Sequence, residues 1–389
     1  MSRRVAVVGA GILGACVGWE LTRLGADVVL IDAGRPGEGV TNWSFSWVNA
    51  SNKTARRSYF ELNVAGMGAY RELAGIVGPD SWWHPSGHLR WADDPVAHAG
   101  LLETARLLDD WDYRVELLSG AEVRRRLEPA LAIADDAPVL FYPDEAWVHG
   151  RRLVSLLVGQ AVALGAERYF GTAVRDISTA SDGSVRTVVL SDGTRLGVDA
   201  VVNAAGPDAA HIAALVARHL PMRHEPGVVT RLTCPQVPIR RAMHTPYVEI
   251  RPDGDGSVVL HSREVDAQID TPPQPARRLQ DSAEQAVPEL GDAGARDAAR
   301  PAWWLRDLAG IVVPELGGAG VAGTRMSERP VPADGYPSVG AVPGVSGYYE
   351  AVTHSGITLG PVIGRLLASE IVGGADSELL ADFRPGRLC

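Results

Sequence analysis

The chain contains little cysteine and almost no lysine. Its three cysteines, Cys16, Cys234 and Cys389, lie far apart and form no C-x-x-C pair. This pattern argues against a disulfide framework and against a zinc site, so no metal is expected. Lys53 is the only lysine among 389 residues, every other strong base being arginine. That lysine either has a specific role or occupies an ordinary surface position.

The sequence also lacks an excess of basic residues and a long apolar run. Its 37 Lys and Arg residues stand against 47 Asp and Glu residues, a formal net charge of −10. No basic surface therefore favours nucleic acid or an anionic membrane as a partner. No uninterrupted apolar run is long enough to span a bilayer, so no membrane span is expected. A strand expected within a few residues of the N-terminus leaves no room for a signal peptide, which indicates a cytoplasmic protein.

The length and composition indicate a large folded core. A chain of 389 residues that is 46% hydrophobic can form two domains, or one domain with a large insertion. Between residues 81 and 149, short strands such as His88–Trp91 alternate with helical pieces such as Ala97–Asp110, which is typical of an inserted α+β region. Longer helical and strand patterns return after residue 150.

The N-terminus carries the pattern of a dinucleotide-binding βαβ unit. The apolar run Val5–Val8 leads into Gly9, Gly11 and Gly14 in the spacing G-x-G-x-x-G, and a helical pattern follows. The first glycine allows the tight turn, the second lets the backbone approach a pyrophosphate, and the third lets the helix pack on the strand. The free N–H groups and positive dipole end of the helix face the same pyrophosphate.

The second strand of this unit ends in a carboxylate. The run Val28–Ile31 is followed by Asp32, which can accept hydrogen bonds from both ribose hydroxyls of an adenosine. A polar and aromatic stretch from Thr41 to Lys53 then fits neither the helical nor the strand period. A glycine-rich turn that binds no nucleotide is the alternative, but the complete strand, turn, helix and strand context favours the nucleotide.

Two further segments follow this motif in a characteristic order and spacing. One is a buried-strand pattern that ends in Asn203-Ala204-Ala205-Gly206-Pro207, and the other is a C-terminal block with Glu328–Pro337 and Thr353–Pro361. Their order and spacing resemble the D-amino-acid oxidase family of flavoproteins, which includes glycine oxidase, sarcosine oxidase and D-amino-acid dehydrogenases. The resemblance covers essentially the whole chain. It implies FAD rather than NAD, because in this family the C-terminal block returns to the flavin.

The resemblance implies an α/β protein with a Rossmann-type FAD-binding domain and a second, mixed-sheet α+β substrate domain. The FAD-binding domain would be discontinuous, with residues 1–80, 150–220 and 323–389, and the substrate domain would hold residues 81–149 and 221–322. Residues expected to contact FAD are Gly9, Gly11, Ile12, Leu13, Gly14, Asp32, Ala33, Ser44, Ser46, Val174, Ala205, Gly206, Gly356, Ile357 and Thr358. Sarcosine-oxidase relatives attach FAD through a cysteine just before the C-terminal block. The matching stretch Thr324–Ser327 has none, so non-covalent FAD is expected.

The same resemblance implies residues that contact the substrate. In the family, an Arg-Pro pair upstream of an Asp-Gly-x-Pro turn binds the substrate carboxylate, and Arg329 matches it, with Arg325 in reserve. The planar fork of arginine suits a carboxylate, and a structural ion pair is the alternative role for Arg329. Tyr247 loosely matches a family tyrosine beside that carboxylate, and His261 ends the neighbouring strand and could face the same pocket. Ordinary packing is the alternative for both.

Two basic side chains are expected beside the flavin. His354 precedes the helical pattern Thr358–Val372, whose N-terminus would meet the negative charge that a reduced flavin carries near N1. A capping role without chemistry is the alternative for His354. Lys53 closes the stretch expected to run along the flavin, in a segment where related enzymes place a basic residue near the substrate carboxylate or the oxygen-reacting face.

The expected reaction is oxidation of the C–N bond of an amino acid or N-substituted amino acid. Hydride would pass to flavin N5, giving an imine that hydrolyses. Relatives that react with oxygen carry a lysine on the strand matched by Val258–Leu260, which has none, so oxygen or another electron acceptor remains open. Two alternatives stand. One is a 2-hydroxy acid dehydrogenase, in which His354 or His261 would serve as the general base. The other is a flavin-binding subunit of a larger dehydrogenase complex.

Overall fold

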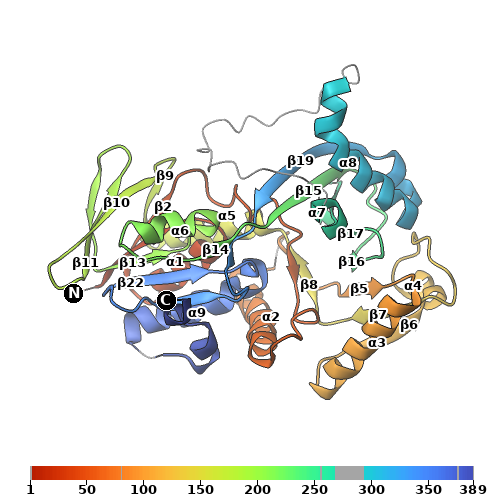
Figure 1. The fold of residues 1–389 in the computed structure, drawn as a ribbon, viewed down its shortest axis with the longest axis horizontal. Coiled ribbons are helices and arrows are strands. Elements are labelled where there is room, and N and C mark those ends of the chain that lie inside the picture. The colour runs from red at the N-terminus through yellow and green to blue at the C-terminus, as the bar shows by residue number, and fades with distance from the viewer. Residues whose placement is uncertain (1, 80, 255, 268–292, 375, 389) are drawn as a thin grey trace.

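The computed structural model describes all residues except 1, 80, 255, 268–292, 375 and 389. One half of the molecule is built on a six-stranded sheet in the order β21-β22-β13-β1-β2-β9, in which only β21 runs antiparallel to its neighbour. The strands are β1 (Arg4–Val8), β2 (Asp27–Asp32), β9 (Glu167–Phe170), β13 (Ala200–Asn203), β21 (Ser338–Ala341) and β22 (Tyr348–Val352). Pieces from the beginning, middle and end of the chain thus form one Rossmann-type sheet, as expected (Figure 1).

Helices pack against this sheet and against one another. They are α1 (Ile12–Arg23), α2 (Arg57–Val77), α5 (Gly150–Ala163) and α9 (Gly356–Gly373). Gly14 allows α1 to approach the first strand: a Cβ atom there would lie 1.7 Å from the carbonyl oxygen of Gly9. The role predicted for the third glycine of the motif is therefore visible in the packing.

Helix α9 passes a test of length and apolar composition for a membrane span, with a mean hydropathy of 1.2 over 18 residues. In the fold, 67% of that window is buried inside the protein, where α9 packs on α1 and α2. Cys16 of α1 touches this helix, since a Cβ on Gly364 would lie 2.8 Å from the Cys16 Cβ. The apolar character of α9 thus serves the core of the first half.

The other half is built on an eight-stranded sheet in the order β19-β15-β18-β17-β16-β5-β7-β6. Its strands are β5 (His88–Trp91), β6 (Glu116–Ser119), β7 (Pro138–Tyr142), β15 (Pro226–Thr233), β16 (Ala242–His244), β17 (Glu249–Gly254), β18 (Ser257–His261) and β19 (Gly320–Glu328). All neighbouring pairs are antiparallel except β16 with β5. Strand β19 pairs with β15 along its length and so carries this sheet past residue 323, where the sequence placed a domain boundary.

Four helices accompany this second sheet. They are α3 (Pro95–Asp110), α4 (Gly120–Arg126), α7 (Arg263–Ala267) and α8 (Ala293–Val312). The sequence pattern over 272–287 predicts a helical piece, but those residues lie outside the described ones. The Ala-, Gly- and Asp-rich run over 289–299 predicts a loop, yet its part from Ala293 belongs to α8, in agreement with the high helix propensity of its alanines.

Small sheets complete the fold. β3 (Trp47–Val48) and β4 (Trp83–His84) flank β8 (Ala146–Val148), and β14 (Met222–Arg223) pairs with β20 (Val331–Pro332). The hairpin strands β10 (Val174–Thr179), β11 (Val185–Leu190) and β12 (Arg195–Gly197) form a separate sheet, followed after β13 by the short helix α6 (Ala209–Ala214). Asp208 precedes α6 but its side chain makes no capping hydrogen bond, because its backbone already belongs to a 3-10 turn over Gly206–Asp208.

Candidate active site

The expected FAD-contacting segments converge at one edge of the parallel sheet. Gly9 has a φ of +103°, and a Cβ there would lie 2.3 Å from the carbonyl oxygen of Ala204, so the turns after β1 and β13 touch. Gly206 follows with a φ of +59°. The N-terminus of α9 meets the same place, because a Cβ on Gly356 would lie 3.4 Å from Ile12. Ala205 lies in the turn after β13, and Leu13 in the first turn of α1.

Asp32 holds the loop that follows β2. Its Oδ2 accepts the N–H of Ala10 at 2.6 Å, and its Oδ1 accepts the N–H of Gly34 at 2.7 Å. Burial raises the pKa of the Asp32 carboxyl, and these two hydrogen bonds oppose that rise. The backbone oxygen of Asp32 accepts the N–H of Thr172, which brings the start of β10 with Val174 to the same edge, beside Ala33.

The polar and aromatic stretch runs from this edge toward α9. Thr41 Oγ1 accepts the N–H of Ile12 at 3.0 Å, at the first turn of α1. Ser44 and Ser46 hydrogen-bond to one another at 2.8 Å, and Ser46 has a φ of +53°, which is strained for a residue other than glycine. Thr358 Oγ1 donates to the carbonyl oxygen of Trp47, so this stretch lies against the start of α9.

Three buried polar atoms in this stretch have no hydrogen-bond partner among the described residues: Asn49 Oδ1, Ser51 Oγ and Asn52 Oδ1. Buried polar atoms are nearly always satisfied, so a run of such atoms indicates a missing polar ligand. A flavin ring, with its alternating donors and acceptors, fits that requirement. Only the irregular period of the stretch signals these residues in the sequence, and they were not among the predicted contacts.

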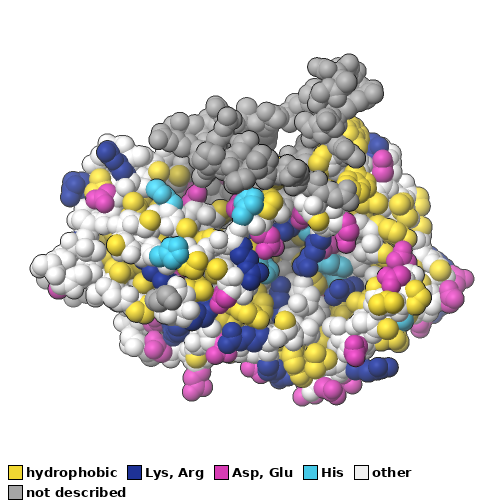
Figure 2. Space-filling model, viewed as in Figure 1, with side chains coloured by type: hydrophobic (Ala, Val, Ile, Leu, Met, Phe, Trp, Pro, Cys, Tyr) yellow, Lys and Arg dark blue, Asp and Glu magenta, His cyan; other side chains and the backbone are white. Residues whose placement is uncertain are grey.

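The N-terminus of α9 carries His354 and Ser355. Tyr59 and Ser355 share a hydrogen bond of 2.6 Å between their hydroxyls. His354 is exposed. Figure 2 shows a hollow in the middle of one face, lined by basic side chains of the Lys/Arg class and by His side chains. Loss of surrounding water lowers the pKa of His354 to about 3, and the charges of Lys53, Arg329 and Arg263 add to that effect. His354 is therefore neutral at pH 7.

Lys53 is buried, with 9% of its surface exposed. Its ammonium group lies 5.8 Å from the centre of the Tyr59 ring, and it has no hydrogen bond or ion pair among the described residues. Burial lowers the pKa of the Lys53 amine to about 8, and the charge of Arg263 lowers it further, against the opposing charges of Glu145 and Glu249. The alternative of an ordinary surface lysine is excluded by this burial.

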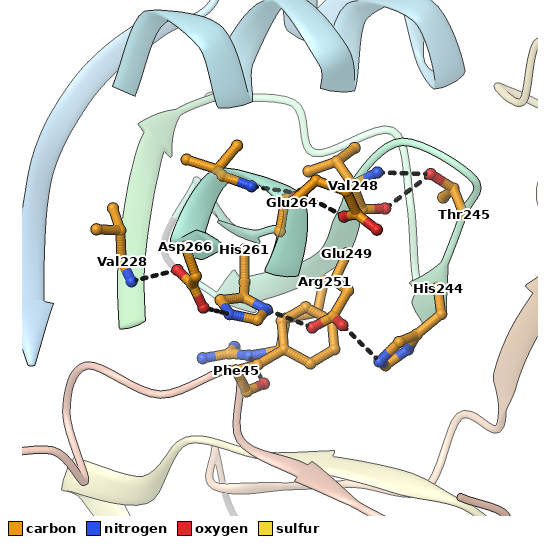
Figure 3. Close-up of polar contacts among 12 residues, drawn as sticks. Phe45, Val228, His244, Thr245, Val248, Glu249, Arg251, His261, Glu264 and Asp266 are labelled. Carbon is orange, nitrogen blue, oxygen red and sulfur yellow. Dashed lines mark hydrogen bonds and ion pairs between the residues drawn. The ribbon is translucent and has the colours of Figure 1, made fainter. Parts of the chain in front are cut away.

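A row of polar side chains crosses the face of the eight-stranded sheet, and Figure 3 shows its part from Asp266 through His261 and Glu249 to His244. We call it the polar ladder; it continues to His88 and ends at Glu145, whose carboxyl lies 3.6 Å from His88 Nδ1. His261 donates to Asp266 across 2.8 Å and to Glu249 across 2.6 Å. Glu249 accepts from His244 at 3.1 Å, and the His244 ring meets the His88 ring at 2.7 Å.

The inner end of the polar ladder is Glu145, which is fully buried. Its carboxyl accepts hydrogen bonds from Trp47, Ser51 and Tyr113, and burial raises its pKa to about 7. Trp47 also stacks on His88, with 4.3 Å between ring centres. The ladder thus joins the polar and aromatic stretch from Thr41 to Lys53, hereafter the flavin-side stretch because it is expected to run along the flavin, to the second sheet. The sequence could not reveal the ladder, because its members lie on five helices and strands and one turn.

Arg329 sits at the outer end of the ladder. Its guanidinium donates to Asp266 at 2.5 Å and lies 3.4 Å from a Glu225 oxygen. Each ring nitrogen of His261 faces a carboxylate, and its Nε2 also lies 2.8 Å from Nη2 of Arg329. Those carboxylates overcome the effect of burial and raise the pKa of His261 to about 9. Arg329 and His261 therefore lie together near the site, each already paired with a carboxylate.

The structure does not bring Tyr247 or Arg325 to this group. Tyr247 is 36% exposed and its hydroxyl hydrogen-bonds to Asp93, which is not a member of the ladder. Arg325 donates to the backbone oxygen of Glu38, in the loop after β2. Along β17 the residue that reaches the ladder is Glu249, two positions after Tyr247, which a sequence pattern alone did not single out.

Replacing Glu249 with glutamine should remove a pH-dependent part of the stability. The raised His261 pKa stabilises the fold fully below pH 6.5, and this contribution is lost as the pH rises through about 9. A shift of this size corresponds to about 3 kcal/mol. We expect the difference in free energy of unfolding between wild type and Glu249→Gln to shrink between pH 6.5 and 9.5, as measured by urea unfolding. A constant difference across that range would contradict the pairing of His261 with Glu249.

A glycine turn against a helix N-terminus at the edge of a parallel sheet is the arrangement of a dinucleotide-binding protein. The chain belongs to the FAD dependent oxidoreductase family, whose model matches residues 4–370. It is 26% identical over 402 residues to the uncharacterized oxidoreductase YurR of Bacillus subtilis, covering 97% of each chain. Its fold matches glycine oxidase from Geobacillus kaustophilus with a TM-score of 0.82, 23% identity and 99% of each chain covered. It matches iminodiacetate oxidase from Chelativorans sp. BNC1 with a TM-score of 0.77, 26% identity, and 98% and 99% covered.

Proposed function

We propose that this FAD-dependent oxidoreductase oxidises the C–N bond of an amino acid or N-substituted amino acid, with FAD held non-covalently. The observation that carries the proposal is Lys53, a buried cation without a partner at the flavin-side stretch. Burying an unpaired charge is costly, so such a site is built for an anion that arrives with a ligand. A substrate carboxylate is the anion that an amino-acid substrate brings.

The cofactor contacts of the proposal follow from the described segments. Gly9, Gly11 and the first turn of α1 would hold the pyrophosphate, Asp32 the ribose, and Asn49, Ser51 and Asn52 the flavin ring. When bound, FAD supplies the hydride acceptor. No cysteine lies in the stretch Thr324–Ser327, which supports non-covalent binding.

Lys53 takes the place of Arg329 as the first candidate for the substrate carboxylate. Arg329 already faces Asp266 and Glu225, whereas Lys53 has three N–H donors free of any described partner. Holding the carboxylate fixes the reacting carbon, which is most of what such a reaction needs. The positive charges of Lys53 and Arg263 also disfavour a protonated amine beside them, so they favour the neutral amine that can lose hydride. Arg329 would add positive charge to the site while it stays paired with Asp266.

The resemblance to enzymes named for amine substrates supports the same reaction class. Iminodiacetate is an N-substituted amino acid, and glycine an unsubstituted one. A 2-hydroxy acid would need a general base, and the neutral His354 is the side chain at the site that could serve. That alternative is decided by the same experiment as the proposal.

The test is the visible spectrum of the purified holoprotein under anaerobic conditions, recorded while D- and L-amino acids, N-methyl amino acids and 2-hydroxy acids are added. Bleaching of the flavin band by an amine would support the proposal, and bleaching by hydroxy acids alone would overturn it. Readmission of air would then separate an oxidase from a dehydrogenase. Acid precipitation should leave the flavin in the supernatant, whereas yellow colour in the pellet would contradict non-covalent binding.

A further inference from the structure

Glu145 lies in the turn between β7 and β8 and holds the flavin-side stretch at two points. Its Oε2 accepts the indole N–H of Trp47 at 2.8 Å, and its Oε1 accepts the backbone N–H of Ser51 at 3.1 Å. On the other side, Thr358 Oγ1 donates to the carbonyl oxygen of Trp47 and lies 3.3 Å from the backbone nitrogen of Asn49. The segment from Trp47 to Ser51 is therefore held between a buried carboxyl group and the first turn of α9.

The atoms that this segment offers to a ligand lie between these two supports or directly after them. Asn49 Oδ1 and Asn52 Oδ1 are buried without a hydrogen-bond partner among the residues that the structure describes. The backbone N–H of Lys53 donates to the carbonyl oxygen of Ala50 at 2.9 Å, which ties Lys53 to the same turn. Because Glu145 fixes the backbone of this turn, it also fixes the atoms that are expected to face the flavin ring.

The polar ladder determines where the hydrogens lie next to Glu145. Glu249 faces His244 and His261, and these two partners outweigh burial and hold the pKa of Glu249 well below its usual range (Figure 3). His244 therefore carries its hydrogen on Nε2, toward Glu249, and its Nδ1 accepts the Nε2–H of His88 at 2.7 Å. That leaves His88 Nδ1 without a hydrogen. It has no hydrogen-bond partner among the described side chains and lies 3.6 Å from Oε2 of Glu145.

A nitrogen lone pair that faces a carboxyl group is repelled by the ionised form and attracted by the protonated form. Both His88 and Glu145 are fully buried. Burial lowers the pKa of His88 well below its usual range and raises the pKa of Glu145 to about 7. Tyr113, which donates to Glu145 at 2.7 Å, and Tyr142 and Lys53 are the other titratable groups that interact with this carboxyl. Hydrogen-bond direction and burial thus favour the same protonated form.

We propose that Glu145 is a positioning residue for FAD, which holds the flavin-side stretch as a protonated, neutral carboxyl group. In this form it fixes the stretch without placing a negative charge beside a cofactor that becomes more negative on reduction. The inference rests on the proposed placement of the flavin along this stretch, and it is independent of which substrate is oxidised.

The positioning is tested by the release of FAD from the holoprotein on dilution at pH 6, followed by flavin fluorescence. Trp47→Phe removes one hydrogen bond to Glu145 but keeps a ring that can stack on His88. We expect it to raise the dissociation constant of FAD about tenfold, the equivalent of one hydrogen bond. Glu145→Gln should have a similar effect, because an amide nitrogen cannot accept the hydrogen bond that one of the carboxyl oxygens accepts.

Glu128→Gln is the matched control. Glu128 follows α4, is also fully buried, and accepts the backbone N–H of Arg240 at 3.1 Å and a guanidinium N–H of Arg241 at 3.3 Å. This variant should lose stability yet keep the dissociation constant of FAD within twofold of the wild type. If the two variants of the flavin-side contact also lose stability without releasing FAD, the positioning role is refuted. Trp47→Phe alone decides the matter if Glu145→Gln does not fold.

The charge of Glu145 is tested by the midpoint potential of the bound flavin, measured from pH 5.5 to 8.5 in the wild type and in Glu145→Gln. Lys53 titrates in this range in both proteins, so the difference between the two curves reports Glu145. We expect parallel curves below pH 6 and a wild-type potential that becomes relatively more negative as the pH rises through about 7. Curves that stay parallel throughout would overturn the protonated carboxyl. Neither measurement involves an amine, so a failure of the proposed oxidation would appear separately, as a flavin that no amine bleaches.

Discussion

Gly14→Ala should produce a protein that neither retains FAD nor unfolds cooperatively at the wild-type temperature. The added Cβ would lie 1.7 Å from the carbonyl oxygen of Gly9, which is backbone and cannot rotate away. Relief requires α1 to move off the strand, which opens the pyrophosphate turn and separates α1 from α9. Overpacking of this kind costs about 3 kcal/mol or more. The loss would appear as a colourless protein after gel filtration and as a lowered Tm.

Gly159→Ala is the matched control. This glycine lies in α5, where an added Cβ would meet nothing within 4 Å. Alanine in a helix interior is favoured over glycine by about 0.5–1 kcal/mol, so the control should retain FAD and gain a little stability. A yellow Gly14→Ala protein with wild-type stability would show that α1 does not depend on this close approach.

The nucleotide-binding half could be predicted from the sequence because its information is local. The glycine spacing, the strand before it and Asp32 all lie within one βαβ unit, and the structure places them at one edge of the sheet. The strand Ala200–Asn203 and helix α9 were found in the same way, from short apolar patterns next to glycine turns. Local patterns also predict the strand that ends at His261, which the structure pairs with β17 as β18.

The polar ladder could not be predicted, since it depends on the register between strands that are distant in sequence. His244 and His261 both pair with Glu249 in the sheet, so all three side chains lie on one face, yet no short motif connects them. Tyr247 lies before β17, which begins at Glu249, and is 36% exposed, so strand register does not bring it to this face. The ion-pair partners of Arg329 could not be predicted either, because Glu225 and Asp266 reach it only through the tertiary fold.

The single lysine of the chain, Lys53, became informative only once the structure showed its burial. A single lysine has no spacing to interpret, and the stretch around it matched no regular element. Burial decides between the two roles that the sequence left open for Lys53, since a surface residue would be solvated. The unsatisfied atoms of Asn49, Ser51 and Asn52 in the same stretch point to the same conclusion, that this segment faces a ligand.

Lys53→Met should therefore stabilise the protein while it weakens substrate binding. In the folded state the Lys53 pKa falls from 10.5 to about 8, so the fold disfavours the charged amine. The resulting penalty is fully present below pH 8 and is relieved as the pH rises toward 10.5. Removing it should raise the free energy of unfolding at pH 7 by up to about 3 kcal/mol. Loss of a charge-assisted hydrogen bond should weaken the binding of butyrate or a substrate by about 100-fold.

Urea unfolding of wild type and Lys53→Met at pH 7 and at pH 10.5, with FAD in constant excess, checks the stability half of this prediction. The advantage of the variant should shrink at the higher pH, because the wild-type lysine is then neutral in the folded state and half neutral in the unfolded state. The binding half is measured by titrating the FAD-loaded protein with butyrate and following thermal unfolding, which gives the dissociation constant. A variant that loses stability at pH 7 would mean that Lys53 has a structural partner. One that binds carboxylates as tightly as the wild type would remove Lys53 from the site, because a buried cation kept for a substrate anion must affect that anion's affinity.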